Sequence, residues 1–233
     1  LSLFITTVLY GQDGLMSEMN KAYADGNYKK CIKIGAKATD RDDDYDYQLL
    51  MGISRMELAG EAFLENEFPK EFDNSIETAI KLSKLEVTFE EDEEREGFFK
   101  DLGQYLIDAV DFNLEEANKD ALLELPDRLN RFSKIDSLEP TSYFLVAACD
   151  LAAAGPSKFF ESFDKAYAAA SYWESIKELP QDKQNRIRNA GTLLSYTCLN
   201  FGQKAKAIMI AAKLKAWLPS DETIMSLFDA LRE

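Results

Sequence analysis

The stretch from Gly26 to Ile32 reads Gly-Asn-Tyr-Lys-Lys-Cys-Ile, and the stretch from Gly202 to Ile208 reads Gly-Gln-Lys-Ala-Lys-Ala-Ile. Each stretch follows one amphipathic segment and begins another, so its glycine marks a turn between two helices. A helical hairpin of this kind has an apolar face that it must bury against a neighbouring element. Hairpins near both ends therefore predict a stack of hairpins along the chain.

The composition agrees with helices throughout the chain. Hydrophobic residues make up 46% of the 233 residues and charged residues 30%, as is typical of a folded protein with a core. The chain has 11 Gly and 6 Pro, fewer than a sandwich or barrel of many short strands usually needs for its turns. Ala, Leu, Lys and Glu are common and favour helix. We therefore predict an all-α fold.

The spacing of apolar residues predicts about ten helices in five antiparallel hairpins, with a further C-terminal helix that caps the stack. We expect Asp73 or Asn74 to cap the fourth helix and Pro126 to kink or split the sixth. Turn glycines are expected near positions 26, 60, 103, 155 and 202, an irregular spacing typical of a degenerate solenoid. The predicted helices are 15–25 and 28–39, 45–59 and 75–85, 92–111 and 114–135, 143–154 and 156–177, 181–200 and 202–217, and 222–232.

Both end segments resemble tetratricopeptide repeats (TPRs), in which a Gly-x-aromatic turn is followed by small residues at fixed spacing and often by a proline. Met51-Gly52 is similar to the Leu-Gly pair of that family, and the middle hairpins match it only as helix pairs. The resemblance implies a TPR-like solenoid that binds a protein or peptide and does not catalyse a reaction. The matching positions are Gly26, Tyr28, Cys31 and Ala38, and Gly202, Lys204 (in place of the aromatic), Ala207 and Pro219.

The first eleven residues are mostly apolar and uncharged, and a polar chain follows them. We interpret 1–11 as the end of a secretory signal peptide, with Gly11 before the cleavage site, and 12–233 as a single TPR-like domain. This interpretation predicts export to the periplasm or cell envelope. The alternative is a buried first strand or helix in a cytoplasmic protein. No run in the sequence is long and apolar enough for a transmembrane helix.

The formal net charge of −15 argues against binding to nucleic acid or to anionic lipid, because both draw affinity from basic residues. The segment 181–218 differs from the rest, with seven basic residues and one acidic residue, Asp182. Two interpretations are open: the basic residues are solvated helix positions, or they form a surface for an acidic segment or a peptide carboxylate.

The residues present favour a protein that is not an enzyme. The sequence has no histidine, which removes His-based acid–base chemistry, nucleophilic triads and His-ligated metals. Its three cysteines form no CxxC pair and are interpreted as buried apolar residues. We expect neither a cofactor nor a metal, although a hydrolase that uses paired carboxylates stays open.

Two acidic segments are candidate binding sites. Asp40, Asp42, Asp44 and Asp46 alternate, but Tyr45 and Met51 occupy the positions at which a calcium-binding EF-hand loop has Gly and Glu. The run from Glu90 to Glu96 is typical of a solvated face, with docking of a basic partner as the alternative. Whether either segment binds anything is left open at this stage.

The candidate binding face lies on the helix predicted at 181–200. Arg and Asn side chains on one stripe there can hydrogen-bond an extended peptide, while a tyrosine supplies apolar contact. First helices of hairpins line the groove in the resembling family. The candidate residues are Arg186, Asn189, Leu193, Tyr196 and Asn200.

The sequence therefore predicts a non-catalytic scaffold subunit of a cell-envelope complex, which holds a protein or peptide partner. The alternative is a glycan-binding accessory protein of an envelope uptake system, with an aromatic platform. Helical spacing makes core packing the competing explanation for those aromatics. They are Phe159, Phe160, Phe163, Tyr167, Tyr172 and Trp173.

Overall fold

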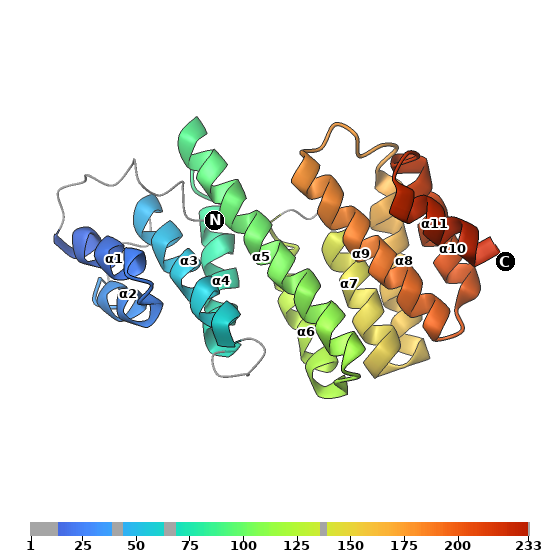
Figure 1. Cartoon of the computed structure of the whole chain (residues 1–233). Helices are drawn as coiled ribbons and strands as arrows, with labels where there is room; N and C mark the ends of the chain where they lie inside the picture. The colour runs from blue at the N-terminus through green and yellow to red at the C-terminus, as the bar shows by residue number, and fades with distance from the viewer. Residues whose placement is uncertain (1–13, 39–43, 63–68, 136–138, 233) are drawn as a thin grey trace. The chain divides into compact units, whose positions relative to one another are not determined.

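The computed structural model describes residues 14–38, 44–62, 69–135 and 139–232, and every regular element in these ranges is a helix (Figure 1). The chain divides into two compact units, 1–102 and 103–233, with the boundary inside α5 (Phe89–Glu115). The interpretation of residues 1–11 falls outside the described residues, and the single domain over 12–233 stays a prediction.

The N-terminal unit contains two packed hairpins and the first half of α5. The hairpins are α1 (Gly14–Ala24) with α2 (Tyr28–Gly35), and α3 (Tyr45–Ala62) with α4 (Pro69–Leu82). Helix α2 also packs on α3, so the second hairpin stacks on the first. The first core cluster comprises Met16, Met19, Ala22, Cys31, Ile34, Tyr47, Leu50 and Met51.

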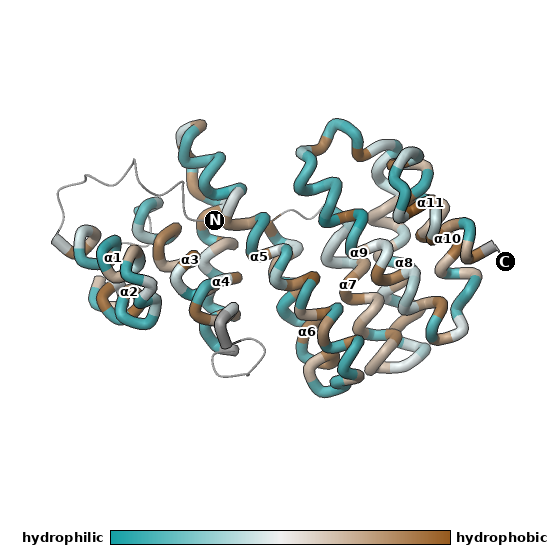
Figure 2. Tube along the Cα trace, viewed as in Figure 1, coloured by the Kyte–Doolittle hydropathy of each residue, from teal (hydrophilic) through white to brown (hydrophobic). Residues whose placement is uncertain are grey.

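The C-terminal unit continues the same arrangement. Helix α7 packs on α6, α8 and α9, helix α10 packs on α9, and α11 covers α10 and α9. In Figure 2 most helices carry both polar and apolar segments, as amphipathic helices with one face in a core do. The elements are α6 (Lys119–Phe132), α7 (Thr141–Cys149), the π-helix η1 (Asp150–Ala154), α8 (Pro156–Tyr172), α9 (Gln181–Asn200), α10 (Lys204–Trp217) and α11 (Glu222–Arg232).

Stacked antiparallel hairpins with a capping C-terminal helix confirm the predicted all-α, TPR-like fold. In the described ranges no helix has both the length and the apolar character needed to span a membrane.

Three hairpin turns share one backbone geometry, although only two of them contain glycine. Gly26, Ala117 and Gly202 have φ values of 69°, 51° and 73°. In each case the next residue donates its N–H to a carbonyl five residues earlier, at 2.9, 3.0 and 2.7 Å, which closes the end of the first helix. The turn at Ala117 was missed because an alanine occupies the position at which sequence analysis looks for glycine.

Two expected turn glycines lie inside helices instead. Gly60 belongs to the last turns of α3, and Gly103 lies in the middle of α5. Helix α4 begins at Pro69, six residues before the predicted start, because proline is well suited to the first helical turn. Asp73 and Asn74 are therefore interior residues and not caps. Helix α6 continues through Pro126 as one helix and is not split.

The start of α5 and the end of α8 also differ from the predicted bounds, each for a local structural reason. Helix α5 begins at Phe89 because Thr88 and Glu91 form a reciprocal cap. The Thr88 N–H donates to Glu91 Oε2 at 2.6 Å, and the Glu91 N–H donates to Thr88 Oγ1 at 3.3 Å. Helix α8 ends at Tyr172, five residues before the predicted end at 177, because the next residue, Trp173, takes an extended conformation.

Candidate functional site

Helix α9, which carries the candidate residues, is held in place by close packing. Ile187, Ala190, Leu194 and Cys198 form one fully buried face. A Cβ atom at Gly191 would lie 2.9 Å from Leu214 of α10 and 3.2 Å from Phe144 of α7, so the three helices meet where α9 has no side chain. The opposite face of α9 is therefore presented on a rigid support.

Arg186 does not lie on that exposed face. Its side chain is only 5% exposed, and its guanidinium is held by the carboxylates of Glu139 and Asp182, with Nη–O distances of 3.2 and 3.1 Å. Thr141 donates its hydroxyl to the same Glu139 at 2.6 Å. The predicted peptide contact is thus a buried ion pair that joins α9 to the start of α7.

The other four predicted residues do share the outward stripe of α9. Asn189 and Leu193 are half-buried, Asn200 is exposed, and the Tyr196 side chain is 45% exposed. Leu199, near the end of α9, and Phe201, its C-cap residue, are also exposed, and sequence analysis missed both. For Leu199, its position three residues after Tyr196 was the available signal. We call Asn189, Leu193, Tyr196, Leu199, Asn200 and Phe201 the α9 surface.

The basic residues of 181–218 are largely used within the protein. Five of them each contact a carboxylate, a carbonyl or an aromatic ring from outside their own helix or from another turn of the chain, so they do not form a continuous free basic surface. Neither open interpretation of this segment anticipated such internal contacts. The pairs are Arg186 with Glu139, Arg188 with Asp221 (3.2 Å), Lys206 with Asp164 (3.7 Å), Lys213 with the Trp173 carbonyl (2.9 Å) and Lys215 with the Phe228 ring (4.3 Å from its centroid).

The aromatic residues of α8 do not form one exposed platform. Phe159 and Phe163 are fully buried, and the Lys206 ammonium lies 4.1 Å from the Phe163 ring centroid. Phe160 and Tyr172 are exposed, but their separation of twelve residues corresponds to about 18 Å along a helix. The geometry gives the glycan-binding alternative no support on this helix.

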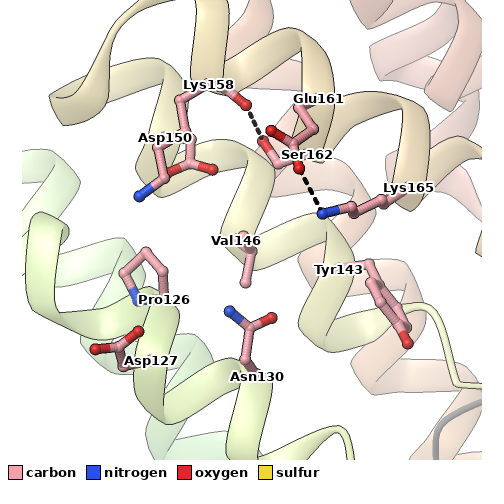
Figure 3. A pocket seen from close by; sticks show the side chains of 10 residues that line it. All are labelled: Pro126, Asp127, Asn130, Tyr143, Val146, Asp150, Lys158, Glu161, Ser162 and Lys165. Carbon is pink, nitrogen blue, oxygen red and sulfur yellow. Dashed lines mark hydrogen bonds and ion pairs between the residues drawn. The ribbon is translucent and has the colours of Figure 1, made fainter.

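A second candidate site is a cleft of about 140 Å³ between α6, α7 with η1, and α8, which we call the α6–α8 cleft. Figure 3 shows its lining side chains arranged around one opening. Oppositely charged groups meet there, and the Lys165 ammonium contacts Glu161 at 2.7 Å. The lining residues are Pro126, Asp127, Asn130, Tyr143, Val146, Asp150, Lys158, Glu161, Ser162 and Lys165.

Asp150 is the buried member of this cleft. It is 3% exposed, and its carboxylate has an ion pair with Lys158 at 3.7 Å, longer than a hydrogen bond. Burying a carboxylate costs several kcal/mol. An ion pair with Lys158, whose side chain is 60% exposed, offsets at most about 1 kcal/mol of this. The fold therefore keeps in the cleft a carboxylate whose ion pair with Lys158 is long and weak.

The backbone at Asp150 is also unusual. Its carbonyl accepts the N–H of Gly155, five residues later, at 2.9 Å, as in a π-helix. Short π-helical segments inside α-helices occur frequently at functional sites. Here the segment places the buried carboxylate at the cleft, a feature for which the sequence offers no visible signal.

The acidic segments have local structural roles. Asp44 accepts the N–H of Tyr47 at 3.1 Å and caps α3, whereas Asp40 and Asp42 fall outside the described residues. Burial raises the pKa of Asp46, as does the nearby charge of Asp44, and burial likewise raises the pKa of Glu94, which faces Asp46. The described residues contain no group of three His, Cys, Asp or Glu side chains placed to hold a metal ion.

Comparison with known proteins leaves the family open. No protein-family model matches the chain, and no curated protein matches it either. Among solved structures, a thermophilic TPR protein of Thermus thermophilus aligns over 94% of this chain and 97% of its own, with 13% identity and a TM-score of 0.35. At this TM-score the likeness assigns no function. The TPR-like description rests on the hairpins and turns of this chain.

Proposed function

We propose that this protein is a non-catalytic scaffold that binds a protein or peptide partner through the α9 surface. The observation that carries the proposal is the contrast between the two faces of α9. One face is fully buried, while Tyr196 and Leu199 on α9 and Phe201 directly after it are exposed large apolar side chains outside the core. Large exposed apolar side chains on a rigid support are typical of interaction surfaces.

The chemistry of the α9 surface suits a peptide. Tyr196 combines an apolar ring with a hydroxyl, and tyrosine is enriched at protein interfaces for that reason. Asn189 and Asn200 flank it, and the NH₂ group of each can donate to a peptide carbonyl, although Asn189 Oδ1 already accepts from Arg188 Nε at 3.1 Å. Arg186 is not part of the proposed surface, because its guanidinium is engaged by Glu139 and Asp182.

The proposal is tested by affinity purification of the tagged, full-length protein from its native cells, with mild crosslinking and mass spectrometry. Stoichiometric recovery of one or two proteins with the wild type is expected. The double variant Tyr196→Ala, Leu199→Ala should lose most of them. Tyr172→Ala is the matched control, because Tyr172 is an exposed tyrosine on another helix. Equal recovery of the partner with the wild type, the double variant and Tyr172→Ala contradicts the assignment of the α9 surface.

We further propose that the scaffold is exported and acts in the cell envelope. Support comes from the apolar, uncharged sequence of residues 1–11 followed by a polar chain. Mass spectrometry of the N-terminus of the protein from its native cells tests this. A chain that starts at Gln12 or Asp13 supports export, whereas a chain that retains residues 1–11 contradicts it.

A further inference from the structure

We infer that the α6–α8 cleft is a second contact point, at which the guanidinium or ammonium group of a partner's Arg or Lys side chain pairs with Asp150. The inference rests on the proposed function, because it takes the ligand to be part of a protein partner. Three observations meet at this residue: a cleft, a buried aspartate whose carboxylate has a long ion pair with an exposed lysine, and a π-helical turn that begins at it.

The chemistry of the cleft selects an organic cation. A buried carboxylate accepts hydrogen bonds and favours a positive charge beside it. A metal ion would need several converging ligands, and the described residues supply no group of three. Asp150 is deeply recessed, so a slender side chain with its charge at the tip reaches it best. Arg and Lys side chains have this shape.

In the free protein the Lys158 ammonium is the cation beside Asp150, and the contact between them is weak. Its ammonium lies 3.7 Å from Asp150 Oδ1, beyond hydrogen-bond distance, and most of its side chain is exposed. An incoming guanidinium can approach closer and form two parallel hydrogen bonds with the carboxylate. Lys158 would then swing into solvent. The exposed residues Asp127 and Asn130 of α6 and Glu161 of α8 leave room along the rim for the partner's backbone.

The test uses ¹⁵N-labelled full-length protein and the amide resonances of residues 150–155. The probes are acetyl-Gly-Arg-Gly-amide, its Gln counterpart and methylguanidinium. The Arg tripeptide should give saturable shifts and bind more tightly than methylguanidinium, and the Gln tripeptide should give none. Asp150→Asn should weaken the Arg tripeptide about tenfold or more, the effect of losing a charge-assisted hydrogen bond. Glu161→Gln, which leaves Asp150 intact, should change affinity less than about threefold.

A second substitution, expected to tighten binding, keeps the test valid if the Asp150→Asn variant does not fold. Lys158→Gln should tighten binding of the Arg tripeptide by about threefold, because it removes the competing ammonium. Lys177→Gln, at an exposed position outside the cleft, makes the same change in net charge and should have a smaller effect. Absence of saturable shifts with the wild type, or equal binding by the wild type and Asp150→Asn, overturns the inference. Methylguanidinium binding as tightly as the tripeptide overturns the assignment to a partner's side chain.

Affinity purification separates this inference from the proposed function. Asp150→Asn should lower recovery of the partner. If Tyr196→Ala, Leu199→Ala loses the partner and Asp150→Asn keeps it, the proposed function stands and the inference about the cleft is overturned. If the wild type recovers no protein at all, the proposed function fails, and with it the partner as the source of the cation.

Discussion

Arg186 and Glu139 form a buried ion pair, with Nη2 of the arginine 3.2 Å from Oε2 of the glutamate and both side chains less than a tenth exposed. The two residues are 47 positions apart in the chain. Asp182 and Thr141 complete the hydrogen bonds around them. The pair fixes the second turn of α9 against the segment that leads into α7, and so sets the position of the proposed binding helix.

Replacing Arg186 with Met should destabilise the C-terminal unit by about 3–5 kcal/mol, because Glu139 is left as a buried charge without its main partner. Both tryptophans, Trp173 and Trp217, lie in this unit, so urea unfolding followed by tryptophan fluorescence reports its stability. Arg188→Met is the control. Its ion pair with Asp221 is partly exposed, and its loss should cost at most about 1 kcal/mol. Equal losses in the two variants would contradict the burial of the Arg186 pair.

Ala117→Gly should stabilise the same unit by about 0.5–1 kcal/mol. Alanine at a φ of 51° has an unfavourable contact between its Cβ and the backbone, which glycine lacks. The larger entropy of glycine in the unfolded chain offsets part of the gain. Ala168→Gly, at an exposed position inside α8, should instead destabilise by about 0.5–1 kcal/mol. A loss of stability in both variants, in the same fluorescence measurement, would show that Ala117 is not strained.

Glu94→Gln should stabilise the N-terminal unit at pH 7 and low salt by less than about 1 kcal/mol. Burial and the charges of Asp46, Glu91 and Glu90 raise the pKa of Glu94, so the folded state binds its proton more tightly than the unfolded state. Stability from this group therefore increases as pH falls through its pKa and is lower at neutral pH. The gain from Gln should vanish near pH 3.5, about where glutamate is protonated in both states.

Hydrogen exchange of amides in α3 and the first half of α5 measures this local stability. Glu93→Gln is the control, since Glu93 lies in the same acidic run but is exposed. A gain in stability for Glu94→Gln that persists in high salt and at low pH would rule out an electrostatic origin. Salt screens exposed charges, and low pH removes the charge of Glu94.

The three cysteine thiols should resist Ellman's reagent in the native protein at pH 8 and react fully in guanidinium chloride. All three are buried and free, and burial raises the pKa of the Cys198 thiol to about 12. Burial also raises the thiol pKa values of Cys31 and Cys149. Because the folded state holds these protons more tightly, stability should fall as pH rises above about 9. Ser157→Cys, at an exposed position, provides a thiol that should react at once. Rapid labelling of the wild type would contradict the burial.

The candidate site was only partly predictable. The stripe of Asn189, Leu193, Tyr196 and Asn200 follows from helical spacing, which places residues three and four apart on one face. The burial of Arg186 does not follow, because an arginine on a predicted helix is normally exposed, and its partner Glu139 is remote in the chain. Asp150 gave no signal, since the cleft around it is made by three helices that only the packing brings together.

The sequence by itself determined the local structure. Apolar spacing defined the helices, and Gly26 and Gly202 marked two turns. Both signals are readable in the sequence because each acts over only a few residues. What only the tertiary structure decided is which polar groups are buried and with what partners. Ala117 could adopt a glycine conformation because the flanking helices and their hydrogen bonds impose it. Arg186, Lys206 and Lys213 became internal contacts because the stacking of hairpins places distant carboxylates, rings and carbonyls beside them, and burial strengthens such pairs.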